Sequence, residues 1–259
     1  MSLRFIIPAL IIATLGSAIS APTVGAQTTP GPSTTQPTPV RNILASAALP
    51  TVIDVPLHYK LLRVSIPAGQ STSSRGANGF LFQMSGMLAV TTTSDNRTLR
   101  NGDAMFVGRG ESATLKAAGP EPAVFLHFLL LPAADFEKVV EGSPAGVTEL
   151  YRTTAPIPSL KSGPYEFTLT RVTFPPRMPS NPPHYRSGGA LYYVVSGTGT
   201  MTVEGKSETK PTGSRLFEPY GMVHQWGNPG DTPLILLQAN ISPEGVPAVI
   251  FGAPPVGSK

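Results

Sequence analysis

The fold is decided by the stretch Gly213-Ser-Arg-Leu-Phe-Glu-Pro-Tyr-Gly-Met-Val-His-Gln-Trp-Gly-Asn228, in which turn-forming residues separate short apolar runs. Gly102 and Gly110 precede Gly213 and Gly221 by the same offset of 111 residues. Three further turn positions match at this offset without a gap, namely Gly86 with Gly197, Gly119 with Gly230 and Pro122 with Pro233. A constant offset between turns indicates two copies of one β-unit.

The composition favours short strands. The chain of 259 residues contains 26 glycines and 29 prolines, while only 13% of its residues are charged. Glycine and proline interrupt regular elements, so this usage favours many strands joined by turns over helical bundles. Closing each unit into a jelly roll or barrel removes exposed strand edges. The sequence therefore predicts an all-β protein with two barrels.

The second copy resembles the cupin superfamily. The fixed positions of the second cupin motif are matched by Gly213, Pro219, Gly221, His224 and Asn228. Upstream, His184 followed by Tyr193-Val194 and Gly197 fits the spacing of the first cupin motif. The resemblance implies two tandem cupin-type jelly-roll barrels, also called double-stranded β-helices. The first, 43–132, resembles a degenerate cupin, and the second, 150–252, carries the candidate site.

The resemblance also implies a set of metal-ligand positions. Cupins that bind a metal supply two histidines and a glutamate from the first motif and a histidine from the second. In this sequence those positions hold His184, Arg186, Ala190 and His224, so two ligands of four remain. In the first copy they hold Ser73, Arg75, Gly79 and Ala113, which include no ligand. A divalent metal, Fe, Mn, Ni or Zn, would therefore lie on His184 and His224.

The arginine opposes such a metal. Residues two apart on a strand face the same side, so His184, Arg186 and Tyr192 point together into the barrel. At about 4 Å, two unit charges repel by roughly 4 kcal/mol at an effective dielectric near 20, and a dication feels twice that. Because two imidazoles bind metal weakly, a third group would have to come from outside the motif, such as Tyr192, Glu166 or Glu218.

Two alternatives explain Arg186 without a metal. Its planar guanidinium suits a carboxylate or phosphate, so it could bind an anionic ligand beside Tyr192, Glu218 and the two histidines. Alternatively it serves the fold by pairing with an acid at the barrel mouth, and Arg75 in the corresponding position of the first copy is consistent with this. For Glu218, a salt bridge at the rim with Arg215 is the expectation.

The remaining segments have distinct compositions. Residues 1–26 have the layout of a secretory signal peptide, with Arg4, an apolar run and small residues, so a secreted or periplasmic protein without a stable membrane span after cleavage is expected. The Thr- and Pro-rich segment 27–42 reads as a disordered tether. Phe136, Val139 and Val140 predict a short helix within a linker, 133–149, and 253–259 forms a tail.

Composition excludes some functions and leaves three open. There is no cysteine, and the Lys and Arg residues behind the net charge of +4 are scattered, which argues against a nucleic-acid partner. One hypothesis is a binding protein for a small organic acid or sugar derivative. The second is a metal-dependent enzyme of the dioxygenase or isomerase type, with catalytic residues unknown. The third is a structural cupin, and a homodimer is compatible with each.

Overall fold

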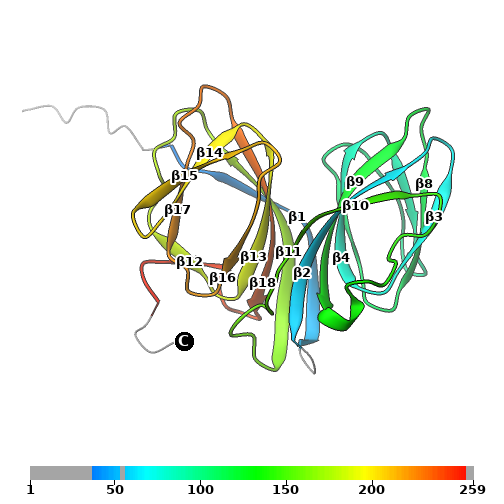
Figure 1. The fold of residues 1–259 in the computed structure, drawn as a ribbon, viewed down its shortest axis with the longest axis horizontal. Coiled ribbons are helices and arrows are strands. Elements are labelled where there is room, and N and C mark those ends of the chain that lie inside the picture. Colours follow the sequence, from blue (N-terminus) through cyan, green and yellow to red (C-terminus); the bar gives the residue numbers. More distant parts are fainter. Residues whose placement is uncertain (1–36, 53–55, 255–259) are drawn as a thin grey trace, which may run out of the picture. The chain divides into compact units, whose positions relative to one another are not determined.

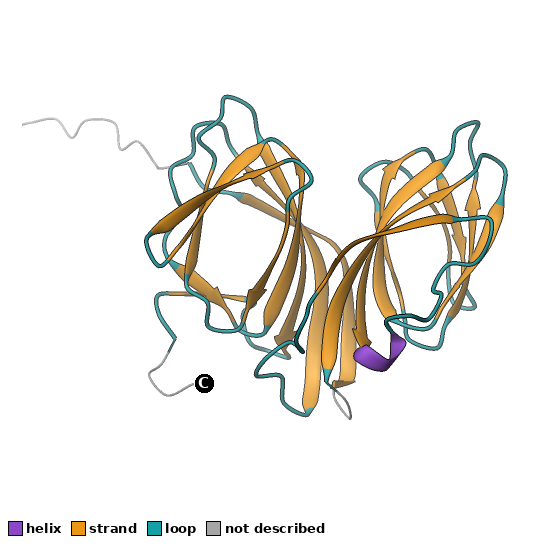
Figure 2. Ribbon diagram, in the orientation of Figure 1, coloured by secondary structure: helices purple, strands orange, loops and turns teal. Residues whose placement is uncertain are grey.

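The computed structural model describes residues 37–52 and 56–254. The predicted signal peptide and the first part of the predicted tether, 27–36, lie outside these residues, as do the last residues of the predicted tail. No helix in the described part of the chain has the length and apolar character needed to cross a membrane. Figure 2 shows strands throughout the described residues, with a short helical turn at Ala133–Asp135, which confirms the all-β expectation.

The first barrel consists of two sheets (Figure 1). One has the order β10-β2-β9-β4-β7, formed by β10 (Gly146–Arg152), β2 (Leu57–Ile66), β9 (Ala123–Pro132), β4 (Asn78–Ser85) and β7 (Ala104–Val107). The other has the order β3-β8-β5-β6, formed by β3 (Ser71–Arg75), β8 (Ser112–Ala117), β5 (Leu88–Thr91) and β6 (Asn96–Leu99).

The second barrel repeats this plan. Its first sheet has the order β1-β11-β18-β13-β16, formed by β1 (Val40–Val52), β11 (Gly163–Phe174), β18 (Leu234–Pro243), β13 (Gly189–Ser196) and β16 (Arg215–Pro219). Its second sheet has the order β15-β14-β17-β12-β19, formed by β15 (Lys206–Pro211), β14 (Thr198–Val203), β17 (His224–Gly227), β12 (His184–Arg186) and β19 (Val249–Phe251).

Two strands belong to the barrel that they do not adjoin in sequence. Strand β1 precedes the first barrel, yet it pairs antiparallel with β11 of the second over 40–52. Strand β10 precedes the second barrel, yet it pairs with β2 of the first. The expectation that 43–52 belongs to the first barrel is therefore wrong for this strand, and Val40 to Asn42, expected in the tether, are part of it. Each barrel borrows an edge strand from the other half of the chain.

The linker contains no α-helix in its described residues. Only Ala133–Asp135 form a helical turn, of the 3₁₀ type (η1). Further along the linker, the backbone forms hydrogen bonds with β3. Arg75 N donates to Val140 O (3.0 Å), and Gly142 N donates to Ser73 O (3.1 Å). A backbone group engaged with a neighbouring strand cannot also close a helical turn. The predicted connecting helix is thus wrong.

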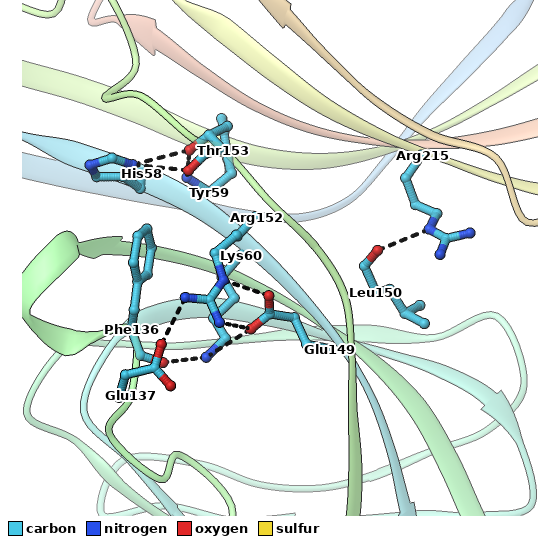
Figure 3. A network of polar contacts seen from close by, with 10 residues as sticks. All are labelled: His58, Tyr59, Lys60, Phe136, Glu137, Glu149, Leu150, Arg152, Thr153 and Arg215. Atoms are coloured by element: carbon cyan, nitrogen blue, oxygen red, sulfur yellow. Dashed lines mark hydrogen bonds and ion pairs between the residues drawn. The ribbon is translucent and has the colours of Figure 1, made fainter.

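One apolar cluster contains residues of both barrels. It includes Tyr59 and Phe80 of the first and Phe167 of the second, and the rings of Phe80 and Phe167 have centroids 4.4 Å apart. Polar contacts of the borrowed strand β10 accompany it (Figure 3). Lys60 Nζ lies 3.4 Å from Glu149 Oε2, and Arg215 Nε of β16 donates to Leu150 O at 3.1 Å. Apolar packing between the two barrels is therefore accompanied by an ion pair and a hydrogen bond of the exchanged strand β10.

The two copies differ by one residue of register at β3. In the second barrel His184 is the strand partner of His224, and in the first Ser74 is the partner of Ala113. Ala113 and His224 keep the offset of 111, so Ser74, and not Ser73, occupies the place of His184. A one-residue slip turns every side chain of a strand to its other face. Arg75 is accordingly exposed, while Arg186 is buried, and the expected equivalence of the two arginines is wrong.

Candidate functional site

The two motif histidines meet inside the second barrel. His184 begins β12 and His224 begins β17, and these neighbouring antiparallel strands pair the two residues directly. Both side chains are buried, and their ring centroids lie 4.2 Å apart. The sequence motifs, separated by forty residues of chain, thus converge on one place, as the resemblance implies.

Both imidazoles are oriented by the same local hydrogen bond. His184 Nδ1 lies 3.0 Å from the carbonyl oxygen of Pro182, and His224 Nδ1 lies 2.9 Å from that of Met222. A carbonyl only accepts, so each ring carries a proton on Nδ1. Neither Nε2 atom has a hydrogen-bond partner among the described residues. Two buried ring nitrogens therefore lie side by side without a hydrogen-bond partner.

A buried ion pair lies beside the histidines. Arg186 Nε donates to Glu218 Oε2 at 2.9 Å, and both side chains are almost fully excluded from solvent. Trp226 Nε1 donates to the other carboxylate oxygen, Oε1, at 3.0 Å. His224 Nε2 also lies 3.0 Å from Glu218 Oε2, within ion-pair distance but without hydrogen-bond geometry. The carboxylate is thus surrounded by donors and neutralised by one guanidinium.

The rest of the Arg186 guanidinium is also occupied. It contacts the hydroxyl of Tyr192, whose ring lies 5.4 Å from the guanidinium carbon. With the Gln238 amide oriented so that its oxygen faces the arginine, Oε1 accepts from Nη1 at 2.6 Å and from Nη2 at 3.1 Å. The neighbours of an amide decide which orientation it takes. The hydrogen bonds of Arg186 are therefore made to side chains of the barrel itself.

These contacts shift the ionisation of the cluster. Burial, then the charge of His224, lower the pKa of His184 to about 4, so this ring is neutral near pH 7. Burial alone would raise the pKa of Glu218, but Arg186 and His224 outweigh it and lower the pKa to about 2. Burial raises the pKa of the Tyr192 hydroxyl well above its usual value. The site therefore combines a fixed ion pair with neutral, lone-pair-bearing imidazole nitrogen.

Most of the predicted residues gather here, although some of their expected roles do not hold. His184, Arg186, Tyr192, Glu218 and His224 all belong to the cluster. Glu218 is fully buried and pairs with Arg186, so the expected rim salt bridge with Arg215 is wrong. Glu166 is exposed and stands apart from the cluster. Arg186 indeed pairs with an acid, as one alternative had it, but in the barrel interior and not at its mouth.

Three site residues were missed by the sequence analysis as partners of this cluster. Trp226 of β17 donates its indole N–H to Glu218. Gln238 of β18 faces Arg186, and it lies on an apolar strand without a motif. Arg41 of β1 reaches Gln238 from the far end of the sequence, with Nη1 3.3 Å from Oε1. No sequence signal identifies Arg41, because its approach depends on the exchange of β1.

The donor set does not fit a catalytic metal. The described residues contain no group of three or more His, Asp or Glu side chains arranged to hold a metal ion. The nearest carboxylate, Glu218, already shares Oε2 with the guanidinium of Arg186. A dication there would lie beside the guanidinium of Arg186, with only two imidazoles as ligands. The metal expected on His184 and His224 is therefore not supported by these side chains.

The hollow around the cluster is closed. It is lined by Arg41, Val172, Phe174, Asn181, His184, Arg186, Tyr192, Trp226, Leu236 and Gln238, and leaves no space for a water molecule. Of these residues only Arg41 is exposed. A depression of about 390 Å³ lies nearby, bordered by His224, Met222 and Thr202. Access to the two imidazoles therefore requires a lining side chain to move.

Among its described residues, the first barrel does not repeat this cluster. At the positions of His184 and His224 it has Ser74 and Ala113, and its interior is mainly aliphatic and aromatic. It does contain one buried ionisable pair, in which His127 Nδ1 contacts Glu141 Oε1. His127 occupies the place of Gln238, at the same offset of 111 residues. By strand pairing, Ser74 and not Ser73 of the expected alignment lies at the place of His184.

Comparison with known proteins supports the fold. Residues 170–239 match the cupin domain family, and none of the curated proteins matches the chain. A mutant of oxalate decarboxylase from Bacillus subtilis is 15% identical, with a TM-score of 0.51 over 82% of this chain and 80% of that one. AerE from Microcystis aeruginosa is 16% identical, with a TM-score of 0.50 over 80% and 96%.

A third solved structure is more distant. Salicylate 1,2-dioxygenase from Pseudaminobacter salicylatoxidans is 10% identical, with a TM-score of 0.49 and 71% of each chain covered. At such identities the likeness of the first two structures concerns the fold alone. It spans most of the described residues, and so includes both barrels.

Proposed function

Because the chain belongs to the cupin superfamily and has two cupin barrels, we propose that the second barrel binds a small hydroxylated molecule, such as a sugar derivative or a small organic acid, without a resident metal. The first barrel then supports the second through the exchanged strands and the shared apolar cluster. The single observation behind this proposal is the pair of buried, unpartnered Nε2 atoms of His184 and His224. Two adjacent ring nitrogens without partners suit a ligand with neighbouring hydroxyl groups, because a hydroxyl can donate or accept a hydrogen bond.

The ion pair gives the binding site a fixed wall. Arg186 and Glu218 neutralise one another and are held by Tyr192, Trp226 and Gln238. A rigid polar network beside His224 need not reorganise when a ligand binds, which limits the entropy lost on binding. Arg186 is therefore a positioning residue, and the ligand contacts are left to the imidazoles.

The proposal is tested by metal analysis and by ligand-observed NMR on the purified protein. We expect less than stoichiometric Fe, Mn, Ni and Zn, and binding of polyols or sugars that is lost in both His184→Ala and His224→Ala. His58→Gln is the matched control, because His58 is a buried histidine of the first barrel and its substitution should leave binding unchanged.

Two results would overturn the proposal. Stoichiometric metal that disappears in the His184→Ala variant would replace it with the metal-dependent enzyme of the dioxygenase or isomerase type. Binding of no polyol, sugar or acid, together with an unchanged fold in both histidine variants, would favour a structural cupin.

We also propose a secreted or periplasmic location from the layout of residues 1–26, and a homodimer as the assembly. Cell fractionation and light scattering check these two points.

A further inference from the structure

Arg41 brings a second guanidinium to the second barrel. It lies on β1, the strand borrowed from the start of the described chain, where it pairs with Val172 of β11. Its Nη1 atom reaches Gln238 Oε1, 3.3 Å away. The site of the second barrel is therefore completed by a residue that precedes the first barrel in sequence.

The two arginines compete for one acceptor. Gln238 has a single side-chain oxygen, which either accepts from Arg41 or, with the amide turned, accepts two bonds from Arg186. The second orientation makes the shorter bonds, and Arg41 then faces the amide nitrogen, which is itself a donor. Among the described residues no carboxylate lies within ion-pair distance of Arg41, while Arg186 has Glu218. The guanidinium of Arg41 is therefore left with more N–H donors than there are acceptors for it among the described residues.

The charge of the hollow follows from this count. Arg186 and Glu218 form an ion pair with one another, and the guanidinium of Arg41 has no such partner among the described residues. Although Arg41 is exposed as a whole, partial loss of water around its guanidinium lowers its pKa; Arg186 adds to this effect, while Tyr192 and Glu218 oppose it. A guanidinium with free donors is the side chain best suited to bind a carboxylate through two parallel hydrogen bonds.

Arg41 is also the lining residue that can move. Every other residue around the hollow is buried, whereas Arg41 is exposed on an edge strand. With the Gln238 amide turned to Arg186, the long, flexible side chain of Arg41 loses no hydrogen bond when it moves away from Gln238. A ligand can therefore replace Gln238 as the partner of Arg41 while it takes the space that the side chain vacates.

We propose that Arg41 binds the carboxylate of the ligand, so that the second barrel selects small hydroxylated carboxylic acids, with a hydroxyl group on His184, which lines the same hollow. This rests on the proposed function, because it assigns the ligand class of the same hollow. It gives to Arg41 the anion-binding role that the sequence analysis gave to Arg186.

A matched pair of probes isolates the carboxylate. Glycerol and glycerate differ by replacement of one hydroxymethyl group with a carboxylate, and each is titrated against the full-length protein by ligand-observed NMR. We expect the wild-type protein to prefer glycerate by about 10-fold or more, since a hydrogen bond to a charged group contributes a factor of this order. In Arg41→Ala and Arg41→Gln the preference should vanish while glycerol binding stays the same.

Arg63→Ala is the control, because Arg63 is an exposed strand arginine of the first barrel; the preference for glycerate should persist in this variant. Equal binding of both probes by the wild-type protein, or a preference that survives in both Arg41 variants, overturns the role of Arg41 and leaves the proposed function intact. Binding of neither probe by the wild-type protein overturns both. A glycerol affinity that falls together with that of glycerate in the Arg41 variants assigns Arg41 to the shape of the hollow and also rejects the carboxylate contact.

Discussion

The two barrels share one strand plan and differ in what fills them. The second contains Arg186, Glu218 and two histidines in a connected polar cluster, whereas the first contains mainly aliphatic and aromatic side chains around the pair His127 and Glu141. The same backbone thus tolerates an apolar interior and a charged one. The difference teaches that the fold does not require the particular polar cluster of the second barrel.

The largest expected effect comes from breaking the ion pair of the second barrel. Glu218→Gln leaves the buried Arg186 without a counter-charge, which should lower the free energy of unfolding by about 3–5 kcal/mol. Chemical denaturation followed by circular dichroism measures this loss. The double variant Arg186→Met with Glu218→Leu should recover most of it, because apolar side chains of similar volume can replace a buried pair. A loss below about 1 kcal/mol in Glu218→Gln would show that the pair is not buried as described.

A smaller effect is expected from the corresponding change in the first barrel. Glu141→Gln keeps the shape of the side chain but weakens its contact with His127, and a buried partner left unsatisfied costs about 1–3 kcal/mol. The same denaturation experiment measures it, with the exposed Glu121→Gln as the control. If Glu141→Gln costs as much as Glu218→Gln, the contrast between the two interiors is not electrostatic.

The smallest effect is expected at Arg75. Arg186→Ala should be strongly destabilising because it leaves Glu218 buried without its cation. Arg75 is exposed, so Arg75→Ala should change the free energy of unfolding by less than about 0.5 kcal/mol. Comparable losses in the two variants would restore the equivalence of the two arginines and contradict the register shift at β3.

Much of the site could be predicted from motif spacing. His184 and His224 were expected together, and they are strand partners. The role of Glu218 was not predictable, because its neighbours in sequence, Arg215 and Pro219, suggest a rim position. Burial of a carboxylate depends on whether a guanidinium from another strand reaches it, and Arg186 does so across 32 residues of chain. The prediction of a helix in the linker was wrong for a similar reason, because backbone groups of the linker form hydrogen bonds with β3.

The sequence by itself determined the two β-units and the place of the histidines. Turn residues act locally, through backbone conformations that glycine and proline favour, so their spacing survives in the sequence as a readable repeat. Tertiary structure alone decided the exchange of β1 and β10, the pairing of Arg186 with Glu218, and the approach of Arg41 to Gln238, which lies 197 residues away. These contacts depend on which distant strands share a sheet and in what register, and short-range sequence patterns do not contain that information.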